Sequence, residues 1–394
     1  MISNGGHLVD SARYAAFRAE IVRRIWAELD PLEQEIEDSG QLPLDRLLPL
    51  LADMGALALL VPAEYGGHGL TIEQYLPVIA EFAKIQGGIR VLVHVHNSFA
   101  HALSEIGSPR QCQAILPGTV TGAQSVAFAL TEPDHGTGRD LGTTARRDGG
   151  DYVVSGRKWL ITNSDIASHF IVLARTGPTG LSALLVERDA PGLTIEPLPE
   201  TMGCKGGQHG QLTFDEVRVP AATSLIGAEG DGEAHLERAL EISRVFIAAS
   251  SLGTAQRAMD LALDHARKRV TFGKPIAERQ AVQRYLAEMA VDVYALRHML
   301  LDAARKWDAG QRIPLEASLC KLFGLEAVGR VTDRALLVQG GIGYTRRSPI
   351  ERLYRDARLN WLEEGPPTVH YLVAARELSA GYSWNDPFGG PYEI

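Results

Sequence analysis

The chain has 394 residues, of which 45% are hydrophobic and 22% charged, so it is long enough for two or three domains with real cores and is not a disordered protein. Its 39 basic and 48 acidic side chains give a formal charge of −9, which disfavours a nucleic-acid partner because phosphate binding normally needs a basic surface. The same charge still allows an anionic ligand, since a local basic cluster can lie within an acidic protein.

The first block of the chain, residues 1–122, is predicted to be helical. The segment Val61–Leu70 interrupts it, because a proline and three glycines within eight residues favour a turn-rich loop over a helix. Amphipathic or apolar patterns favour helices on either side of this loop, over Ala12–Leu29, Leu44–Leu51 and Thr71–Ile85.

Residues 123–230 differ in character and are predicted to form a middle antiparallel β-domain. Short β-branched or apolar runs alternate here with Gly, Pro and Asp turns, a rhythm typical of a small all-β domain. The runs cover residues 153–156, 170–174, 183–186, 212–214 and 217–220.

Residues 231–394 are predicted to form a C-terminal helical bundle, beginning with a long helix over Ala234–Lys268. Eight apolar residues then recur at alternating spacings of four and three, a 3.5-residue repeat that indicates the buried seam of a second long helix. These residues are Val282, Leu286, Met289, Val293, Leu296, Leu300, Ala303 and Trp307. The fold class is therefore predicted to be multidomain α+β, with helical, β and helical blocks in that order.

Several common kinds of site and signal are missing from the sequence. It contains no GxxxxGK[ST] phosphate loop, no Gly-x-Ser-x-Gly elbow and no run of roughly 18 apolar residues, and Met1–Asp10 lacks the pattern of a secretion signal. Three widely spaced cysteines offer neither zinc spacing nor a disulfide framework. We therefore expect a cytoplasmic protein with no membrane partner and no metal site, and interpret three histidines as ordinary helix or loop residues: His94, His96 and His101.

Four segments carry residues suited to chemistry, and each has an ordinary structural alternative. Residues 128–138 can present hydroxyl and backbone donors to a heterocycle or phosphate, or simply form a turn. Lys158–Asn163 is predicted to be the end of a strand that carries a free hydroxyl, and its ordinary alternative is an edge strand. Arg267–Pro275 places cations at a helix C-terminus, where they bind a pyrophosphate or only complement the macrodipole. Leu362–Pro367 contains two adjacent acids that are either solvated or include a catalytic base.

Taken together in this order, these segments resemble the acyl-CoA dehydrogenase family of flavoproteins. The similarity extends from about Leu51 to Leu378, and eight short motifs in family order make it specific although each is weak alone. The motifs lie at Val61–Leu70, Leu130–Pro133, Leu160–Asn163, Phe214–Pro220, Arg269–Ile276, Gln339–Tyr344, Arg355–Ala357 and Glu364–Gly365. The resemblance implies an N-terminal helical domain (1–122), a middle β-domain (123–230) and a C-terminal four-helix bundle (231–394), with FAD as cofactor.

The resemblance also implies a reaction, the α,β-dehydrogenation of an acyl-CoA thioester to the 2,3-enoyl thioester. A carboxylate removes the α-proton while the β-hydride passes to flavin N5, and Glu364 occupies the position of that base, with Glu363 one residue early. Some relatives carry the base at the position matching Ser243, where serine cannot serve. In the family, a ribityl hydroxyl and the backbone N–H of the base polarise the thioester carbonyl, so Glu364 is implied in this role too.

Further positions are implied for the cofactor, the substrate and the partners. FAD is expected at Phe128, Leu130, Thr131, Thr137, Leu160, Ile161, Thr162, Arg269, Phe272, Gln280, Gly340, Gly341 and Thr368. Substrate contacts are expected at Thr137, Glu241, Arg244 and Gly365. In the family, residues matching Arg269, Phe272 and Gln280 reach FAD from a neighbouring subunit, which implies a homo-oligomer, commonly a tetramer. Electron-transfer flavoprotein is the implied acceptor, and fatty acid or amino acid catabolism the implied role.

The chain departs from the family pattern at several positions. The family tryptophan beside the flavin aligns with Leu160, whereas the tryptophan here is Trp159, expected on the other face of its strand. An adenine-contacting glutamine aligns with Leu337, and the residue after Glu-Gly is Pro366 instead of threonine.

These departures motivate alternatives. The altered loop around His135 and Arg139 suggests the same chemistry on a carrier-protein thioester in a biosynthetic pathway. The leucine at position 160 suggests a flavin oxidase or monooxygenase that uses O₂ directly. A flavin-binding or helical interaction protein without turnover is a further alternative, which the retained Glu364-Gly365 pair disfavours.

Overall fold

The computed structural model describes residues 11–135, 140–177, 180–382, 384–385 and 391–392. The chain divides into two compact units, Met1–Leu240 and Glu241–Ile394, and the division falls within the long helix α8 (Gly232–Lys268). No helix in these ranges is both long and apolar enough to cross a membrane. The predicted site residue Thr137 lies outside the described residues.

Six helices precede the sheet of the first unit, in agreement with the predicted helical block. They are α1 (Ser11–Arg24), which a π-helical turn extends to Leu29, α2 (Glu33–Ser39), α3 (Leu44–Asp53), α4 (Ile72–Phe82), α5 (Gly87–Ile106) and α6 (Pro109–Thr121). Capping boxes at Thr71 and Ser108 begin α4 and α6, because each side chain binds a backbone N–H that the helix leaves unpaired. The predicted loop Val61–Leu70 contains only one short 3₁₀ turn, Ala63–Tyr65.

The helices are followed by an eight-stranded sheet, mostly antiparallel, with strand order β6-β7-β3-β2-β4-β5-β8 and with β1 beside β4 in parallel; the short helix α7 (Ala221–Ser224) lies between β7 and β8 in the chain. The strands are β1 (Val126–Ala129), β2 (Thr144–Asp148), β3 (Asp151–Thr162), β4 (His169–Arg175), β5 (Leu181–Glu187), β6 (Leu193–Pro197), β7 (His209–Pro220) and β8 (Leu225–Ile226). Strand β3 lies between β7 and β2, but β2 pairs only with Asp151–Ser155, whereas Lys158, Ile161 and Thr162 pair with β7.

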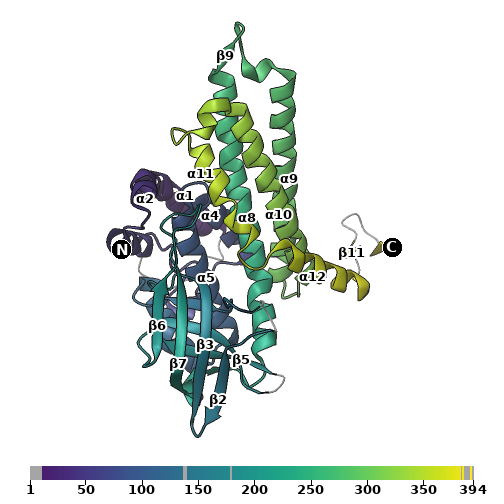
Figure 1. Ribbon diagram of the computed structural model, residues 1–394. Coiled ribbons are helices and arrows are strands. Elements are labelled where there is room, and N and C mark those ends of the chain that lie inside the picture. The colour runs from purple at the N-terminus through teal and green to yellow at the C-terminus, as the bar shows by residue number, and fades with distance from the viewer. Residues whose placement is uncertain (1–10, 136–139, 178–179, 383, 386–390, 393–394) are drawn as a thin grey trace. The chain divides into compact units, whose positions relative to one another are not determined.

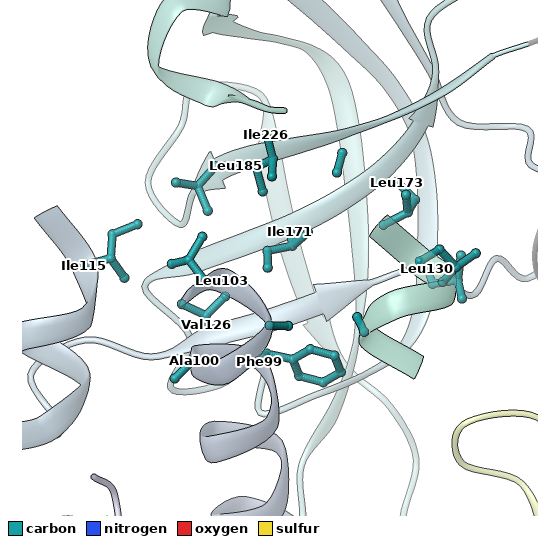
Figure 2. Packing of buried hydrophobic residues seen from close by; sticks show 14 of the residues in the cluster. Phe99, Ala100, Leu103, Ile115, Val126, Leu130, Ile171, Leu173, Leu185 and Ile226 are labelled. Carbon is teal, nitrogen blue, oxygen red and sulfur yellow. The ribbon is translucent and has the colours of Figure 1, made fainter. Parts of the chain in front are cut away.

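Both faces of the sheet carry hydrophobic clusters, which explains the unbroken apolar run in β4. Ile171 and Leu173 belong to a cluster shared with helices α5 and α6, where Phe99 and Leu103 pack against the strands (Figure 2). Phe170 and Val172 belong to a second cluster, because successive side chains of a strand point to opposite faces. A strand buried on both faces has no polar side to alternate with.

The second unit is a helical bundle (Figure 1). After α8, the hairpin β9 (Val270–Thr271) and β10 (Lys274–Pro275) leads to the helices α9 (Gln280–Asp308), α10 (Pro314–Gln339), α11 (Pro349–Asp356) and α12 (Pro367–Ser379). The predicted seam is the buried side of α9 from Met289 to Trp307, whereas Val282 and Leu286 are half-buried. Helices α8, α9 and α10 approach closely at Gly324, where an added Cβ would lie 3.3 Å from Ala248 and 3.5 Å from Leu296.

Candidate active site

A buried ion pair fastens the loop after β1 to strand β3. The Nζ of Lys158 is fully buried, 2.8 Å from Glu132 Oε1 and 3.0 Å from the Leu130 carbonyl, and the backbone N–H of Trp159 donates to the Thr131 carbonyl at 2.8 Å. Burial lowers the pKa of Lys158 to about 8. Although burial alone would raise the pKa of Glu132, Lys158 and the donors of the loop lower it to about 2, so the pair is charged at neutral pH. These bonds fix the Leu130–Thr131 backbone beside β3.

Strand β3 is interrupted by a bulge next to this loop. The pairing of β3 with β7 shifts between Lys158 and Ile161, and Leu160 takes a left-handed backbone with φ 56°. Trp159 and Leu160 are 36% and 46% exposed, while the residues on either side of this pair are buried. The expectation that Trp159 and Leu160 lie on opposite faces assumed unbroken alternation, which the bulge removes. Two large apolar side chains are therefore presented at the surface beside the Leu130–Thr131 backbone.

The remaining sequence-predicted residues of the first unit are packed in place. The ring of Phe128 stacks on Phe99 with centroids 4.9 Å apart, and Ile161 is buried and pairs with Gly210 of β7. The Oγ1 of Thr162 lies 3.0 Å from Nδ1 of His209 on the paired strand β7.

In the second unit, Glu364 lies in a tight turn between a 3₁₀ turn (Leu359–Trp361) and helix α12. Its backbone is left-handed, with φ 58°, and Gly365 follows with φ 97°. The hydroxyl of Ser243, on α8, donates to Glu364 Oε1 at 2.9 Å. Helix α12 then starts with Pro367 at its first position, which suits the missing N–H of proline. The carboxylate is thus held by a helix that is distant in sequence.

Buried cationic and imidazole groups surround this turn. Lys321, on α10, is fully buried with its Nζ 2.6 Å from the Glu363 carbonyl and 3.3 Å from the Gly365 carbonyl. The ring Nε2 of His370 lies 3.0 Å from the same Gly365 carbonyl and must donate to it, since a carbonyl only accepts. Burial, Lys321 and the buried Arg244 lower the pKa of His370 to about 3, so its ring is neutral at physiological pH.

Another predicted substrate contact, Glu241, is engaged within the chain. It is 1% exposed, its Oε2 accepts from Nε of Arg312 at 2.6 Å, and its Oε1 accepts from the backbone N–H of Ile313. Its carboxylate therefore secures the start of α10.

A second group of predicted cofactor residues lies on the hairpin after α8. Phe272 and Gly273 form its two-residue turn with φ 49° and 78°, the left-handed geometry of a type I′ hairpin. The side chain of Phe272 is 96% exposed, and the guanidinium of Arg279 lies 5.8 Å from its ring centroid. Arg269 and Gln280 are also exposed.

Gly340 and Gly341 follow the end of α10. Gly340 has φ 63° and ψ −144°, a conformation essentially reserved for glycine. At Gly341 an added Cβ would meet no atom of the described chain within 4 Å, so no neighbour seen in this structure explains the absence of a side chain.

The predicted residues of the second unit separate into two groups at opposite ends of its long helices. Helix α8 carries Ser243, the partner of Glu364, and continues to Lys268, which is about 37 Å further along at 1.5 Å per residue. Helix α10 carries Lys321 and ends at Gln339, about 27 Å away. Figure 1 shows the β9 hairpin at one end of these helices. Thr368 belongs with Glu364, whereas the hairpin and the two glycines lie far from it along the chain's helices.

Several polar residues beside the loop after β1 and around the Glu364 turn were not predicted from the sequence. From the sequence, Ser243 was only a position unable to supply a base, and the Lys158–Glu132 pair, Lys321 and His370 were not predicted. A usable signal existed for Lys321, because a lysine inside an apolar helical run must find buried partners.

The histidines of α5 have ordinary partners. Nδ1 of His96 lies 3.2 Å from the Ser125 hydroxyl and its Nε2 lies 2.9 Å from the Thr119 carbonyl, while Nδ1 of His94 lies 3.3 Å from Ser98 Oγ. In the described part of the chain, no three His, Cys, Asp or Glu side chains gather where they would hold a metal ion.

Comparison with known proteins gives a consistent result along the chain. Three family models match in order: the acyl-CoA dehydrogenase N-terminal domain over residues 11–123, the middle domain over 127–217 and the C-terminal domain over 230–379. Cyclohexane-1-carbonyl-CoA dehydrogenase from Geobacter metallireducens is 36% identical over 91% of this chain and 96% of its own. An acyl-CoA dehydrogenase from Bacillus subtilis is 35% identical over 90% and 94%. The structure of butyryl-CoA dehydrogenase from Megasphaera elsdenii superposes with a TM-score of 0.89 at 29% identity, covering 96% of this chain and all of that one.

Proposed function

The chain belongs to the acyl-CoA dehydrogenase family, and from this membership we propose that Glu364 is the base of its reaction. The protein is an FAD-dependent oxidoreductase that converts an acyl-CoA thioester to its 2,3-enoyl thioester. The observation that carries the assignment of the base is the turn at Glu364, where a carboxylate in a left-handed backbone is held by the Ser243 hydroxyl.

The residues around Glu364 suit proton abstraction from a carbon acid. The Ser243 hydroxyl donates to Oε1, which fixes the rotamer of the carboxylate and favours its ionised form. Partial burial of Glu364 limits the water that would weaken the base. The α-proton passes to this carboxylate, and the backbone N–H of Glu364 donates to the thioester carbonyl as negative charge develops on it. Bound FAD supplies the acceptor for the β-hydride.

The residues present fit FAD at two places. In the first unit, the exposed Trp159 and Leu160 offer an apolar surface to a flat ring beside the ordered Leu130–Thr131 backbone. In the second unit, the missing side chain at Gly341 leaves room for an outside group to approach the backbone.

The positions of the second unit's residues support an oligomer. Because the hairpin residues lie roughly 37 Å along α8 from the partner of Glu364, we assign the two groups to FAD molecules of different protomers. This requires a homo-oligomer, and we propose a tetramer in which Arg269, Phe272 and Gln280 reach a neighbour's cofactor. Glu241 supports the start of α10, and we retain it with Arg244 and Gly365 as proposed substrate contacts.

The wider setting follows from the family. We propose a cytoplasmic enzyme of fatty acid or amino acid catabolism that passes electrons to electron-transfer flavoprotein. We retain the division into domains at 1–122, 123–230 and 231–394, and Thr137 as a contact of both FAD and substrate.

The test is anaerobic reduction of the bound flavin by a panel of acyl-CoA esters differing in chain length and branching. We expect at least one ester to bleach the flavin absorbance near 450 nm in a single turnover and to yield the 2-enoyl-CoA by mass spectrometry. Reduction only by pantetheine-carrier thioesters would instead support the carrier-protein alternative. Rapid reoxidation by O₂ with release of peroxide would support an oxidase, and a purified protein that binds no FAD would contradict the proposal.

A further inference from the structure

We propose that Lys321 is a positioning residue that aims and strengthens the backbone N–H of Glu364, an inference that rests on the proposed role of that N–H at the thioester carbonyl. Lys321 is fully buried on α10, and its Nζ lies 2.6 Å from the carbonyl of Glu363 and 3.3 Å from that of Gly365. These two carbonyls flank Glu364 on either side. One ammonium group therefore holds both ends of the residue that carries the base.

The planarity of the peptide bond converts this contact into an orientation. The peptide between Glu363 and Glu364 is trans, so the Glu363 carbonyl and the Glu364 N–H point in opposite directions in one rigid plane. Because Lys321 fixes where the carbonyl points, it also fixes where the N–H points, which is away from α10. A charge-assisted hydrogen bond to the carbonyl also polarises the amide and makes its N–H a stronger donor.

The other side of the turn is held in the same way. The Gly365 carbonyl accepts from Nε2 of the neutral His370 at 3.0 Å in addition to Lys321. Glu364 has φ 58°, a conformation that a non-glycine residue keeps only when its surroundings enforce it. Lys321 and His370 provide that enforcement through the carbonyls of Glu363 and Gly365.

The test compares Lys321→Met, which keeps the length of the side chain and removes the ammonium, with Lys321→Gln, which keeps a neutral donor. The readouts are the single-turnover rate of flavin reduction at saturating acyl-CoA and the infrared stretch of a bound enoyl-CoA labelled with ¹³C at its carbonyl, made from the fastest ester of the panel. We expect the methionine variant to reduce flavin about 10²-fold more slowly, near the loss seen when an oxyanion donor is removed. Its carbonyl stretch should return toward the value of the free thioester.

The relative flavin-reduction rates of the two variants distinguish a positioning role of Lys321 from a role in packing alone. Positioning predicts that Lys321→Gln reduces flavin faster than Lys321→Met, because only the glutamine amide can still donate to the Glu363 carbonyl. The matched control is Lys306→Met on α9, which loses ion pairs to Asp302 and Glu316 and should lower stability without moving the carbonyl stretch.

Two results would overturn the inference. One is a methionine variant with the parent's reduction rate and carbonyl stretch, and the other is a reduction rate that follows thermal stability across the variants. Both results leave the proposed function standing, because the parent enzyme still reduces its flavin with an acyl-CoA. If no ester reduces the parent's flavin, the proposed function fails and this inference fails with it.

Discussion

Unusual backbone conformations mark several of the residues that the sequence predicted to be functional. Among the described residues, six that are not glycine have a positive φ, and three of these are predicted site residues: Leu160, Phe272 and Glu364. Such conformations are retained where the surroundings enforce them, often at sites of function. The sequence proposed these three as site residues but could not predict their backbone, because a left-handed φ at leucine, phenylalanine or glutamate depends on bonds made by distant segments.

Ser243→Ala tests the hydrogen bond between the Ser243 hydroxyl and the carboxylate of Glu364. Without the hydroxyl the carboxylate loses a donor that fixes its rotamer, so flavin reduction at saturating acyl-CoA should slow. A hydrogen bond to a charged group contributes about 1.5–3 kcal/mol, so the reduction rate should fall about tenfold. Ser250→Ala is the control, since that hydroxyl donates to the Phe246 carbonyl of the same helix. A reduction rate in the Ser243 variant equal to that of the parent would contradict the assignment.

Because His96 is buried, we expect the first unit to lose stability in acid. Burial lowers its pKa to about 4 from an ordinary 6.5, so between these values the unfolded chain binds a proton that the folded chain does not. Stability is therefore fully present above pH 6.5 and is lost as the pH falls toward 4, by about 2 kcal/mol between pH 7 and pH 5. Urea unfolding at both pH values should show this loss in the parent and a smaller one in His96→Gln. An equal loss in both would show that other groups cause it.

At the scale of elements, regular structure was predictable and its interruptions were not. The 3.5-residue repeat predicted α9, because every turn of a packed helix repeats the same burial. The bulge that exposes Trp159 and Leu160 has no such periodicity. It depends on β7 and on the buried Lys158–Glu132 pair, whose partners are 26 residues apart in the chain.

Lys158→Met tests whether the Lys158–Glu132 pair holds the Leu130–Thr131 backbone in place. The substitution leaves the Glu132 carboxylate buried without its cation, which typically costs about 3–5 kcal/mol and should release the Leu130–Thr131 backbone. We expect a lower melting temperature and loss of FAD during gel filtration. Arg157→Met is the matched control, because its pair with Asp134 is solvent-exposed and contributes little. Full retention of FAD by the Lys158 variant would contradict this role.

At the scale of the whole molecule, the sequence could divide the chain by composition but could not show what packs on what. Helices α5 and α6 share a hydrophobic cluster with strands β1, β4 and β5, so residues on both sides of position 122 belong to one core (Figure 2). An apolar helix face looks the same in a sequence whether it meets another helix or a sheet. The oligomer was likewise implied only by the family resemblance. An exposed aromatic side chain can indicate a contact with another protomer, but the sequence does not show which aromatic side chains are exposed.

Phe272→Asp tests the proposed sharing of cofactor sites between protomers. The side chain is 96% exposed at the tip of the β9–β10 hairpin, where a charge is harmless in a free protomer and unfavourable in a buried contact. We expect smaller assemblies by light scattering together with a lower ratio of flavin to protein absorbance. Lys274→Ala on the same hairpin serves as the control. A tetramer with full FAD content in the Phe272 variant would contradict the sharing.

We propose that Glu364 removes the α-proton, and anaerobic single-turnover reduction of the bound flavin tests this role. With the fastest acyl-CoA ester, Glu364→Gln should reduce flavin about 10² to 10⁴ times more slowly than the parent while still binding FAD and ester. Glu363→Gln removes an equal charge one residue earlier and keeps the carbonyl that Lys321 binds, so it should be far faster than the Glu364 variant. Reduction by Glu364→Gln at the parent's rate would contradict the account.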